Sequence, residues 1–405
     1  MSVATRTYRQ RASEINFQER SNGMDRLQFG DALWRRIVRP FFFVMEPERA
    51  HHAAVQMLEL IGKSEPALNL IRHLYPSPYT DSSCEVGGMR WRNPVGLAAG
   101  FTKDGRGLVA LDAMGFGCIE IGTIVPQPQQ GNPKPRVFRI HDKKEGTLTV
   151  VNRYGFNSEG VAAVANRVHN TLLRNTIITP LIYSIGANKD TVGSADRPDY
   201  IARVADDYVS AFRTLLPILR TNKFINDGIQ INISSPNTPG LRGLFTRLPE
   251  FLRLLDMQTR KFARPSGLPF PPLILKLPPD LENEQFAFVI KEAAQYGFSA
   301  IEAFNTTISS NVRKQFNIRE EGGISGEALR NYAWLKTQTV KRVIKDSGVH
   351  LDLIGVGGIM QGHHAIQKGT KAVQVYTGLI LRGPRLIHEI CAAFRDDMHR
   401  ERGVL

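Results

Sequence analysis

The feature that most constrains the fold is a regular alternation of short apolar segments with helical patterns, which begins near Pro78. Eight segments have the length and composition of buried strands, and helical patterns lie between most of them. Such an alternation predicts parallel strands joined by crossover helices. Strands are expected at 93–99, 117–122, 180–186, 228–233, 272–277, 299–304, 351–356 and 371–376, and helices at 158–173, 199–217, 282–296 and 326–345.

Eight such units over roughly 310 residues predict an α/β fold, a (β/α)8 TIM barrel. A doubly wound sheet is the alternative, but it favours a glycine-rich turn after the first strand. The only turn of that kind, at residues 355–358, follows the seventh expected strand. We therefore expect a barrel (78–405) preceded by a flexible basic N-terminus (1–30) and a small amphipathic helical domain (31–77).

Hydrogen-bonding side chains gather where the fourth expected strand ends. Five of them fall within seven residues, without a carboxylate: Asn232, Ser234, Ser235, Asn237 and Thr238. A turn rich in Asn, Ser and Pro is one interpretation, and a site that holds a flat polar ligand with neutral amides is the other. In a barrel this loop shares one face with the ends of the other strands.

The other strand ends predict a pocket for flavin mononucleotide (FMN). Small residues after the first strand let a flat ring approach the backbone, and glycine turns after the last two strands are the usual phosphate site of this fold. Lys276, between two leucines, is expected to stabilise a reduced, anionic flavin, whereas Tyr376 is either a pocket residue or core packing. The expected cofactor contacts are Ala98, Ala99, Gly100, Thr123, Asn232, Lys276, Asn305, Ser325, Gly326, Gly357, Gly358, Tyr376 and Thr377.

The formal net charge of +14 favours an anionic partner. No zinc-finger or RNA-binding motif and no basic stripe interleaved with aromatics occurs, so we expect an anionic membrane surface and no nucleic acid. Two short amphipathic helical patterns between residues 32 and 64, rimmed by Arg35, Arg36 and Arg39, suit a membrane interface. A helical cap packed on the barrel is the alternative, and no run of about 18 apolar residues predicts a spanning helix.

Cysteines and histidines give no sign of disulfides or of a metal site. The three cysteines, Cys84, Cys118 and Cys391, are far apart and odd in number, which favours a reducing compartment. The histidine pairs at 51–52 and 363–364 lack ligand partners at metal-site spacing. We therefore expect no metal.

Eight strings, in order from about Phe42 to Ile390, resemble the signature of the membrane-associated, quinone-using class of dihydroorotate dehydrogenases. They are NPVGLAAGF (93–101), GNPKPRVFR (131–139), NRYGFNSEG (152–160), INISSPNTPGLR (231–242), NTT (305–307), GGISG (322–326), GVGGI (355–359) and QVYTGL (374–379). The resemblance implies FMN-dependent oxidation of dihydroorotate to orotate in pyrimidine synthesis, with electrons passed to ubiquinone or menaquinone. It implies peripheral attachment to a membrane, expected to be the cytoplasmic face of a bacterial inner membrane, with the mitochondrial inner membrane as the alternative.

The resemblance also implies roles for individual residues. Ser235 stands at the position of the base that takes the substrate C5 proton, while C6 gives a hydride to the flavin, and Thr238 and Phe156 match residues that shape its proton relay. The loop from Ser235 to Phe245 suits a lid. The implied substrate contacts are Lys103, Asn152, Asn232, Asn237, Asn305 and Thr306, and the implied quinone tunnel contains His51, Arg139 and Tyr376.

Several positions depart from the family pattern. Ser184 stands where an asparagine usually contacts the flavin, Ala187 replaces a lysine, Phe304 a threonine and Thr102 an aspartate. The segment from Gly362 to Lys371 is about three residues shorter than expected. We still count Ser184 among the cofactor contacts. Another FMN-dependent barrel oxidoreductase and a non-catalytic membrane-associated relative remain open as alternative functions.

Overall fold

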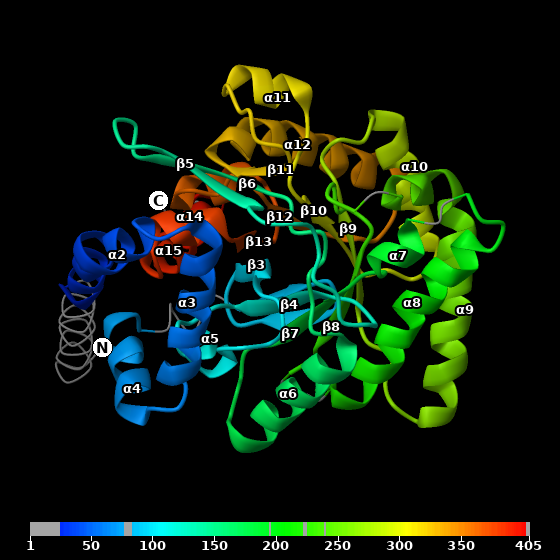
Figure 1. The fold of residues 1–405 in the computed structure, drawn as a ribbon, viewed down its shortest axis with the longest axis horizontal. Helices are drawn as coiled ribbons and strands as arrows, with labels where there is room; N and C mark the ends of the chain where they lie inside the picture. The colour runs from blue at the N-terminus through cyan, green and yellow to red at the C-terminus, as the bar shows by residue number, and fades with distance from the viewer. Residues whose placement is uncertain (1–24, 77–82, 194–195, 222–224, 239, 402–405) are drawn as a thin grey trace, which may run out of the picture.

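A closed barrel of eight parallel strands forms the centre of the computed structural model, which describes residues 25–76, 83–193, 196–221, 225–238 and 240–401 (Figure 1). Each barrel strand pairs with the next one along the chain, and β13 pairs with β3 to close the barrel. The predicted (β/α)8 fold is thus confirmed, and a strand forms in each of the eight expected segments. The barrel strands are β3 (Val95–Thr102), β4 (Cys118–Ile124), β7 (Leu181–Ile185), β8 (Gly228–Asn232), β9 (Leu273–Leu277), β10 (Ala300–Ala303), β12 (Asp352–Val356) and β13 (Ala372–Val375).

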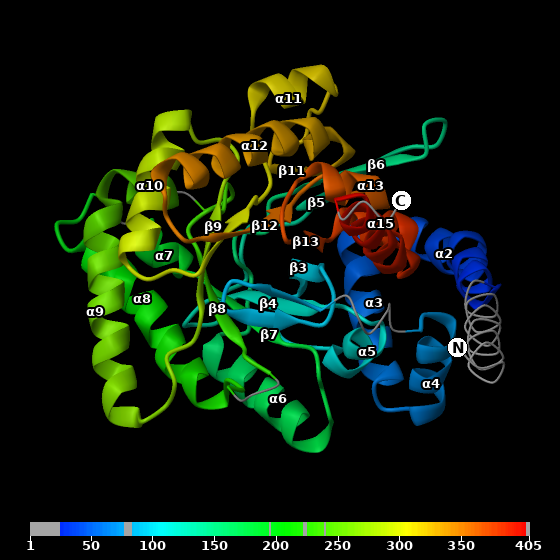
Figure 2. The ribbon, with the colours of Figure 1, turned by 180° about the vertical axis from the view of Figure 1, so that it is seen from behind.

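Helices on the connections between these strands surround the barrel (Figures 1 and 2). The four expected helices are present as α6 (Val161–Arg174), α8 (Tyr200–Leu215), α10 (Asn283–Gln295) and α12 (Arg330–Ser347). The helix before β13, α13 (Gly362–Gln367), is short, as expected. The other helices of the barrel region are α5 (Leu108–Ala113), α7 (Lys189–Val192), α9 (Leu248–Ser266), α11 (Ser310–Gln315), α14 (Thr377–Arg382) and α15 (Arg385–Glu401), with 3-10 turns at Leu216–Ile218, Leu241–Arg247 and Glu327–Leu329.

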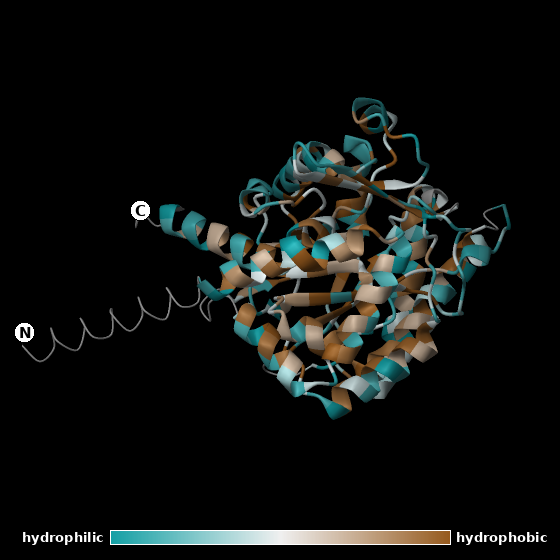
Figure 3. Cartoon of the chain, turned by 60° about the vertical axis from the view of Figure 1, so that its left-hand side comes forward, coloured by the Kyte–Doolittle hydropathy of each residue, from teal (hydrophilic) through white to brown (hydrophobic). Residues whose placement is uncertain are grey.

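The barrel strands are buried on both faces, because helices cover one face and the barrel interior the other. Every residue of β4, β7, β8, β9, β10 and β13 is buried. This double burial requires apolar residues in consecutive positions, which explains the apolar runs in the sequence. In Figure 3 the central strands are mostly brown, whereas teal residues concentrate on the outer helices.

Two small antiparallel sheets close the ends of the barrel, and neither was expected from the sequence. At the amino-terminal end of the strands, β1 (Cys84–Val86) and β2 (Met89–Trp91) form a hairpin whose Val86, Met89 and Trp91 are buried among the strands. At the opposite end, β5 (Val137–Asp142), β6 (Thr147–Asn152) and β11 (Gly323–Gly326) form a sheet beside the barrel mouth. All five strands are short and lie in segments outside the alternation of strand and helix, which therefore gave no sign of them.

The N-terminal helices lie against one side of the barrel, near α5 and α15 (Figures 1 and 2). Residues 25–33 are helical and continue through a π-helical turn (Trp34–Val38) into α2 (Arg39–Phe43), followed by α3 (Pro47–Ile61) and α4 (Glu65–Leu74). No helix in the described ranges is long and apolar enough to cross a membrane. Residues 1–24 of the expected basic N-terminus lie outside the described residues, as does the expected domain boundary after residue 77, so the division into domains stays a prediction.

A buried ion pair fastens α3 to the loop before β5. Glu48 is 2% exposed and Arg136 is 5% exposed. The Arg136 Nη2 atom lies 2.7 Å from Glu48 Oε1, and its Nε atom donates to both carboxylate oxygens at 3.1 Å. Glu46 starts the same helix by accepting hydrogen bonds from two backbone N–H groups of its first turn. Docking of α3 therefore depends on a charge pair with little access to water.

We predict that Glu48→Ala lowers the free energy of unfolding by about 3–5 kcal/mol, because it leaves the Arg136 guanidinium buried without its counter-ion. Denaturant unfolding of both proteins measures the difference. Glu65→Ala is the matched control, since Glu65 on the adjacent helix forms an exposed 2.7 Å pair with Arg72 and should cost less than about 1 kcal/mol. Equal losses in the two variants would contradict the prediction.

Candidate active site

One cavity of about 310 Å³ begins at the carboxyl ends of the barrel strands and extends between the N-terminal helices. This volume falls within the range of small-molecule sites. With two exceptions, the residues expected in the active site and tunnel line it. They are His51, Ala98, Ala99, Gly100, Lys103, Thr123, Arg139, Asn152, Phe156, Asn232, Ser235, Asn237, Lys276, Asn305, Thr306, Ser325, Gly326, Gly357, Gly358, Tyr376 and Thr377.

The two exceptions, Thr238 and Ser184, lie one contact away from the cavity. Thr238 Oγ1 donates to Ser235 Oγ at 3.0 Å. Ser184 is fully buried, and its Oγ lies 3.0 Å from Thr123 Oγ1 and donates to Gln230 Oε1 at 2.7 Å. The structure therefore places Ser184 beneath the cavity wall rather than at its surface.

Ser235 lies on the loop that leaves β8 and is 7% exposed. Its oxygen accepts hydrogen bonds from Thr238 Oγ1 and, at 3.4 Å, from the backbone N–H of Asn237. Two donors on one hydroxyl oxygen stabilise negative charge there, which a serine needs in order to act as a base. Phe156 also borders the cavity and has a φ of 53°, a left-handed conformation that is uncommon for a bulky residue.

Amide side chains from three parts of the chain meet beside Ser235. Asn237 Nδ2 lies 3.4 Å from Asn152 Oδ1, and Asn305 Nδ2 donates to Ser234 Oγ at 3.0 Å. The Asn305 Oδ1 atom accepts from the backbone N–H of Thr306 at 2.7 Å. These contacts hold neutral donors and acceptors around one space, which suits a planar ring with N–H and C=O groups.

Lys103 supplies a cation at the edge of this space. Its Nζ atom lies 3.0 Å from the centre of the Tyr154 ring and donates to Asn157 Oδ1 at 2.5 Å. Burial, followed by the nearby charge of Arg136, lowers the pKa of Lys103 well below its usual value. An anionic group bound beside it would reverse that shift, so the site favours a ligand with a carboxylate.

A layer of buried polar residues from the barrel strands forms the floor of the cavity. Lys276 Nζ lies 2.5 Å from Glu302 Oε1 and 3.5 Å from Glu120 Oε1. Burial alone would lower the pKa of Lys276, but the two carboxyl groups raise it, which keeps the ammonium charged. Burial, followed by repulsion from Glu302, raises the pKa of Glu120 to about 8. At neutral pH the floor therefore holds one protonated carboxyl group beside an ion pair.

The far wall is built from backbone and small residues. Gly357 and Gly358 follow β12 with φ values of 90° and 72°. A Cβ atom on Gly358 would lie 2.2 Å from the Arg330 Cα atom, so only glycine fits there. Thr377 Oγ1 donates to Ser325 Oγ at 3.0 Å. A glycine turn and two hydroxyl groups at the cavity wall suit the phosphate of a nucleotide.

The residues present fit a flavin. Ala98, Ala99 and Gly100 leave room for a ring, and the charged Lys276 faces the same space. Both polar atoms of the Gln374 amide are buried at the cavity wall and lack a hydrogen-bond partner among the described residues. An isoalloxazine offers N–H and C=O groups to such an amide.

The departures from the family pattern are accommodated inside the protein. Phe304 is 1% exposed, packs against Phe286 with ring centres 5.6 Å apart and borders the cavity. Ala187 is fully buried in the hydrophobic core. Thr102 Oγ1 donates to the backbone carbonyl of Arg106 at 2.8 Å. None of these three side chains extends a charge into the cavity.

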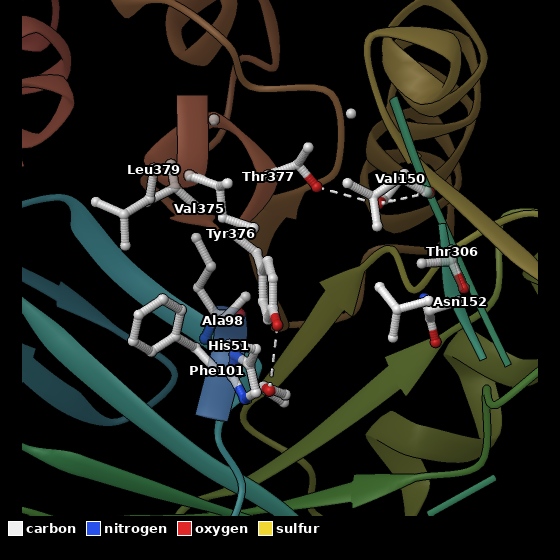
Figure 4. A pocket seen from close by; sticks show the side chains of 18 of the residues that line it. His51, Ala98, Phe101, Val150, Asn152, Thr306, Val375, Tyr376, Thr377 and Leu379 are labelled. Carbon is white, nitrogen blue, oxygen red and sulfur yellow. Dashed lines mark hydrogen bonds between the residues drawn. The ribbon is translucent and has the colours of Figure 1, made fainter. Parts of the chain in front are cut away.

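The other end of the cavity is apolar and lies between α2, α3 and the barrel. Tyr376 and Phe101 have ring centres 5.8 Å apart, and so do Phe101 and His51 (Figure 4). In Figure 4, Asn152 and Thr306 lie on one side of Tyr376, and His51 and Phe101 on the other. Burial, followed by the charge of Lys103, lowers the pKa of His51 to about 3, so its imidazole is neutral.

Arg139 borders this apolar end but uses its donors on the protein. Its guanidinium donates to the backbone carbonyls of Phe42 at 3.0 Å and of Phe43 at 3.2 Å, and to that of Met45. It also lies over the Phe43 ring, 4.7 Å from the ring centre. Arg139 thus holds the carboxyl end of α2 in place and fixes one wall of the passage.

Sequence reasoning missed four residues of the polar floor: Glu120, Gln230, Glu302 and Gln374. Each is a single polar residue in the middle of an apolar strand segment, as Lys276 is. The rule that singled out Lys276, a polar residue flanked by apolar neighbours in a barrel strand, would have found all four. No group of three or more His, Cys, Asp or Glu that could hold a metal ion occurs among the residues that the structure describes.

Comparison with known proteins agrees with this geometry. Residues 82–398 match the family model described as dihydroorotate dehydrogenase. A dihydroorotate dehydrogenase (quinone) of Methylobacillus flagellatus is 36% identical over 365 residues, which cover 88% of this chain and 98% of that one. A protein of the same name from Acidithiobacillus ferrooxidans is 37% identical over 87% of this chain and 92% of its own.

A solved structure is also similar to this fold. The structure of DHODH from Eimeria tenella in complex with ferulenol superimposes with a TM-score of 0.70 at 29% identity, and the match covers 88% of this chain and 92% of that one. The family match spans the whole barrel and the polar end of the cavity, whereas the N-terminal helices that line its apolar end lie before the matched residues. The chain therefore belongs to the dihydroorotate dehydrogenase family.

Proposed function

We propose that this chain oxidises dihydroorotate to orotate with FMN as its cofactor and passes the electrons to ubiquinone or menaquinone. The observation that carries the proposal is the cavity itself, which joins a polar end around Ser235 to an apolar end between the N-terminal helices. The names of the relatives, which include the word quinone, support the electron acceptor. When bound, the flavin supplies the group that accepts a hydride from substrate C6 and returns two electrons to the quinone.

Ser235 acts as the base that removes the C5 proton of the substrate. Its burial excludes water, and the donors Thr238 and Asn237 stabilise charge on its oxygen. The hydroxyl proton of Ser235 has to leave before or during this step. Thr238 Oγ1, at 3.0 Å, can accept it once the Thr238 hydroxyl, which donates to Ser235 in the structure, rotates and releases its own proton toward solvent. Phe156 lines the same cavity, with its backbone in a left-handed conformation.

The amides and Lys103 orient the substrate. Asn152, Asn237 and Asn305, together with Asn232 and Thr306, offer donors and acceptors to the N–H and C=O groups of the dihydroorotate ring. Lys103 pairs with its carboxylate, which compensates for the burial of the ammonium. A substrate held on both its ring and its carboxylate presents C5 to one side chain only.

At the apolar end, the quinone enters between α2 and α3 and stops near Tyr376. The passage is lined by apolar side chains such as Phe42, Ala54 and Met57, with the neutral His51 and the Phe101 ring between them and Tyr376. A lipophilic quinone head can lie among these side chains without an uncompensated charge.

We further propose that the N-terminal helices rest on an anionic membrane surface. Ile37, Phe41 and Val44 are 62%, 63% and 85% exposed and follow one another at helical spacing, so they share a face. The exposed Arg36 lies next to Ile37 in the sequence and suits lipid phosphates. The bacterial relatives favour the cytoplasmic face of a bacterial inner membrane, with the mitochondrial inner membrane as the alternative. We propose no nucleic-acid partner.

An anaerobic titration of the purified protein tests the activity. We expect a yellow protein whose flavin absorbance is bleached by dihydroorotate and restored by a quinone. A yellow protein whose flavin absorbance does not change when dihydroorotate is added would be a different flavin enzyme of this fold. A colourless protein that still binds vesicles would identify a non-catalytic relative.

We predict that Ser235→Ala lowers the rate of flavin reduction by dihydroorotate by about 100- to 10,000-fold, because the proton acceptor is lost. Stopped-flow absorbance measures this half-reaction. The same variant should retain its flavin, and its dithionite-reduced form should still be oxidised by quinone at the normal rate. A wild-type rate of reduction by dihydroorotate would show that Ser235 is not the base.

We predict that Ala54→Trp slows oxidation of the reduced enzyme by quinone at least about tenfold, because the indole fills the apolar passage. Flavin reduction by dihydroorotate should keep its wild-type rate, since Ala54 is remote from Ser235 along the cavity. Leu60→Trp is the matched control, because Leu60 lies on the same helix but is 67% exposed. If both variants oxidise normally, the quinone does not use this passage.

We predict that the double variant Phe41→Asp/Val44→Asp loses more than about tenfold of its affinity for anionic vesicles, since burial of one such side chain contributes about 1.5–3 kcal/mol. Vesicle co-sedimentation measures binding. Turnover with a water-soluble quinone should be unchanged. Leu335→Asp, on α12, removes a comparably exposed apolar side chain away from these helices and should bind vesicles normally. Equal binding by all three proteins would place the membrane contact elsewhere.

A further inference from the structure

The Lys276 ammonium is paired with a carboxylate before any ligand is considered. Parallel pairing of β9 with β10 places Glu302 directly beside Lys276, and their charged atoms lie 2.5 Å apart. Lys276 is 4% exposed and Glu302 is fully buried. The charge that the cavity presents at this point is therefore the charge of the pair, and not that of an isolated lysine.

The other oxygen of Glu302 accepts a hydrogen bond from a second strand. Gln230 Nε2 on β8 donates to Glu302 Oε2 at 2.6 Å, and Ser184 Oγ on β7 donates to Gln230 Oε1 at 2.7 Å. A hydroxyl has one proton, and Ser184 uses its proton on Gln230. The 3.0 Å contact between Thr123 and Ser184 must then have Thr123 as its donor.

The next hydrogen bonds, which extend to the substrate end of the cavity, have the same donor-to-acceptor direction. Asn232 Nδ2 donates to Thr123 Oγ1 at 2.7 Å, and Ser234 Oγ donates to Asn232 Oδ1 at 2.9 Å. Asn305 Nδ2 in turn donates to Ser234 Oγ at 3.0 Å. Every bond from Asn305 to Glu302 thus donates toward Glu302, which is the common acceptor for this chain and for Lys276.

The Glu302 carboxylate, paired with Lys276, ends this row of hydrogen bonds. A negative charge there polarises each hydrogen bond in the row, and the low dielectric of the barrel interior strengthens the effect. A glutamine at position 302 would have one acceptor oxygen and one NH2 donor group. Either the Lys276 ammonium or the Gln230 NH2 group would then face this donor instead of an acceptor. The neighbouring Glu120 does not take this place, because its Oε1 lies 3.5 Å from Lys276, against 2.5 Å for Glu302, and its Oε2 accepts from the backbone N–H of Ala99 at 3.2 Å.

We propose that Glu302 is a positioning residue that sets the reduction potential of the bound flavin by holding the Lys276 ammonium and, through Gln230, Ser184 and Thr123, the Asn232 amide. The inference rests on the proposed FMN site. The negative charge of Glu302 offsets part of the stabilisation that the Lys276 ammonium gives to a reduced, anionic flavin. The reduction potential of the bound flavin is then lower than it would be beside an unpaired lysine, so the reduced flavin transfers its electrons to the quinone more readily.

The test is a spectroscopic redox titration of the flavin in the Glu302→Gln holoenzyme. We expect a higher midpoint potential, because the negative charge 2.5 Å from Lys276 is gone. Burial, followed by repulsion from Glu302, raises the pKa of Glu120. Loss of Glu302 removes that repulsion, so Glu120 would ionise and replace part of the lost charge. Glu120→Gln/Glu302→Gln prevents this and should raise the ratio of reduced to oxidised flavin at a fixed poise on the order of tenfold over Glu120→Gln alone. Glu302→Asp keeps the charge and should restore most of the wild-type potential. Glu120→Gln, the matched control from the same layer, should shift the potential less than Glu302→Gln does.

A variant of the connecting chain separates its effect from that of the charge. Ser184→Ala interrupts the chain between Gln230 and Thr123 and leaves Lys276 and Glu302 in place. It should raise the KM for dihydroorotate through a less constrained Asn232, with a smaller change in potential than Glu302→Gln gives. A flavin-loaded Glu120→Gln/Glu302→Gln enzyme with the same potential as Glu120→Gln alone would overturn the role of Glu302.

If Glu302→Gln does not retain flavin, two other variants decide. Lys276→Met alone should lower the potential, and Lys276→Met/Glu302→Gln, which removes the pair as a unit, should lie closer to the wild type. If the double variant has the same potential as Lys276→Met, Glu302 has no influence and the inference fails. A wild-type protein that binds no flavin would overturn the proposed function and this inference together, whereas a failure confined to the variants leaves the proposed function intact.

Discussion

The closure of eight parallel strands brings polar groups from the whole length of the chain to one rim. β8 delivers Asn232 and the Ser235 loop, β9 delivers Lys276, and β10 leads into Asn305 and Thr306. No two of these strands could offer such a site alone, because each carries only one or two polar residues in an otherwise apolar run. Catalytic groups at the carboxyl ends of several strands are typical of this fold, and here the floor beneath them is polar too.

Burial determines what the charged residues of the site can do. Lys276 stays charged because two carboxyl groups accompany it, whereas Lys103 is buried beside Tyr154 and Arg136 and its pKa falls. The protein itself supplies the counter-charges of Lys276, whereas a bound anionic ligand would supply that of Lys103. The cavity thus has two cationic positions: Lys276, which is charged without a ligand, and Lys103, whose charge a bound carboxylate would stabilise. At the apolar end, burial keeps His51 neutral, which suits an uncharged ligand.

The barrel was predictable from the sequence because eight apolar segments alternate with helical patterns. Most flavin contacts were predictable because they lie at strand ends, which share one face of a barrel. The places of His51, Arg139, Asn152 and Phe156 came from the family resemblance, because these residues lie outside the barrel strands. The β1–β2 hairpin and the sheet of β5, β6 and β11 were missed because they lie in segments outside the alternation of apolar strand and helix from which the barrel was predicted. Ser184 was expected at the cavity surface by family resemblance, but its short side chain ends on Gln230, one contact behind it. Glu302 could have been singled out by the rule that found Lys276, but its pairing with Lys276 depends on the register of β9 and β10, which a single strand cannot reveal.

The hairpin that fills the amino-terminal end of the barrel restricts the route by which a cofactor can enter. Val86, Met89 and Trp91 fill the amino-terminal end, and no residue of the hairpin borders the cavity. A nucleotide therefore cannot thread through the base of the barrel and has to arrive from the mouth. At that end, α2 and α3 line the apolar part of the cavity, where the Glu48–Arg136 pair and the Arg139 bonds hold them in place. The prosthetic group and the substrate would therefore share the end of the barrel at which the catalytic groups lie.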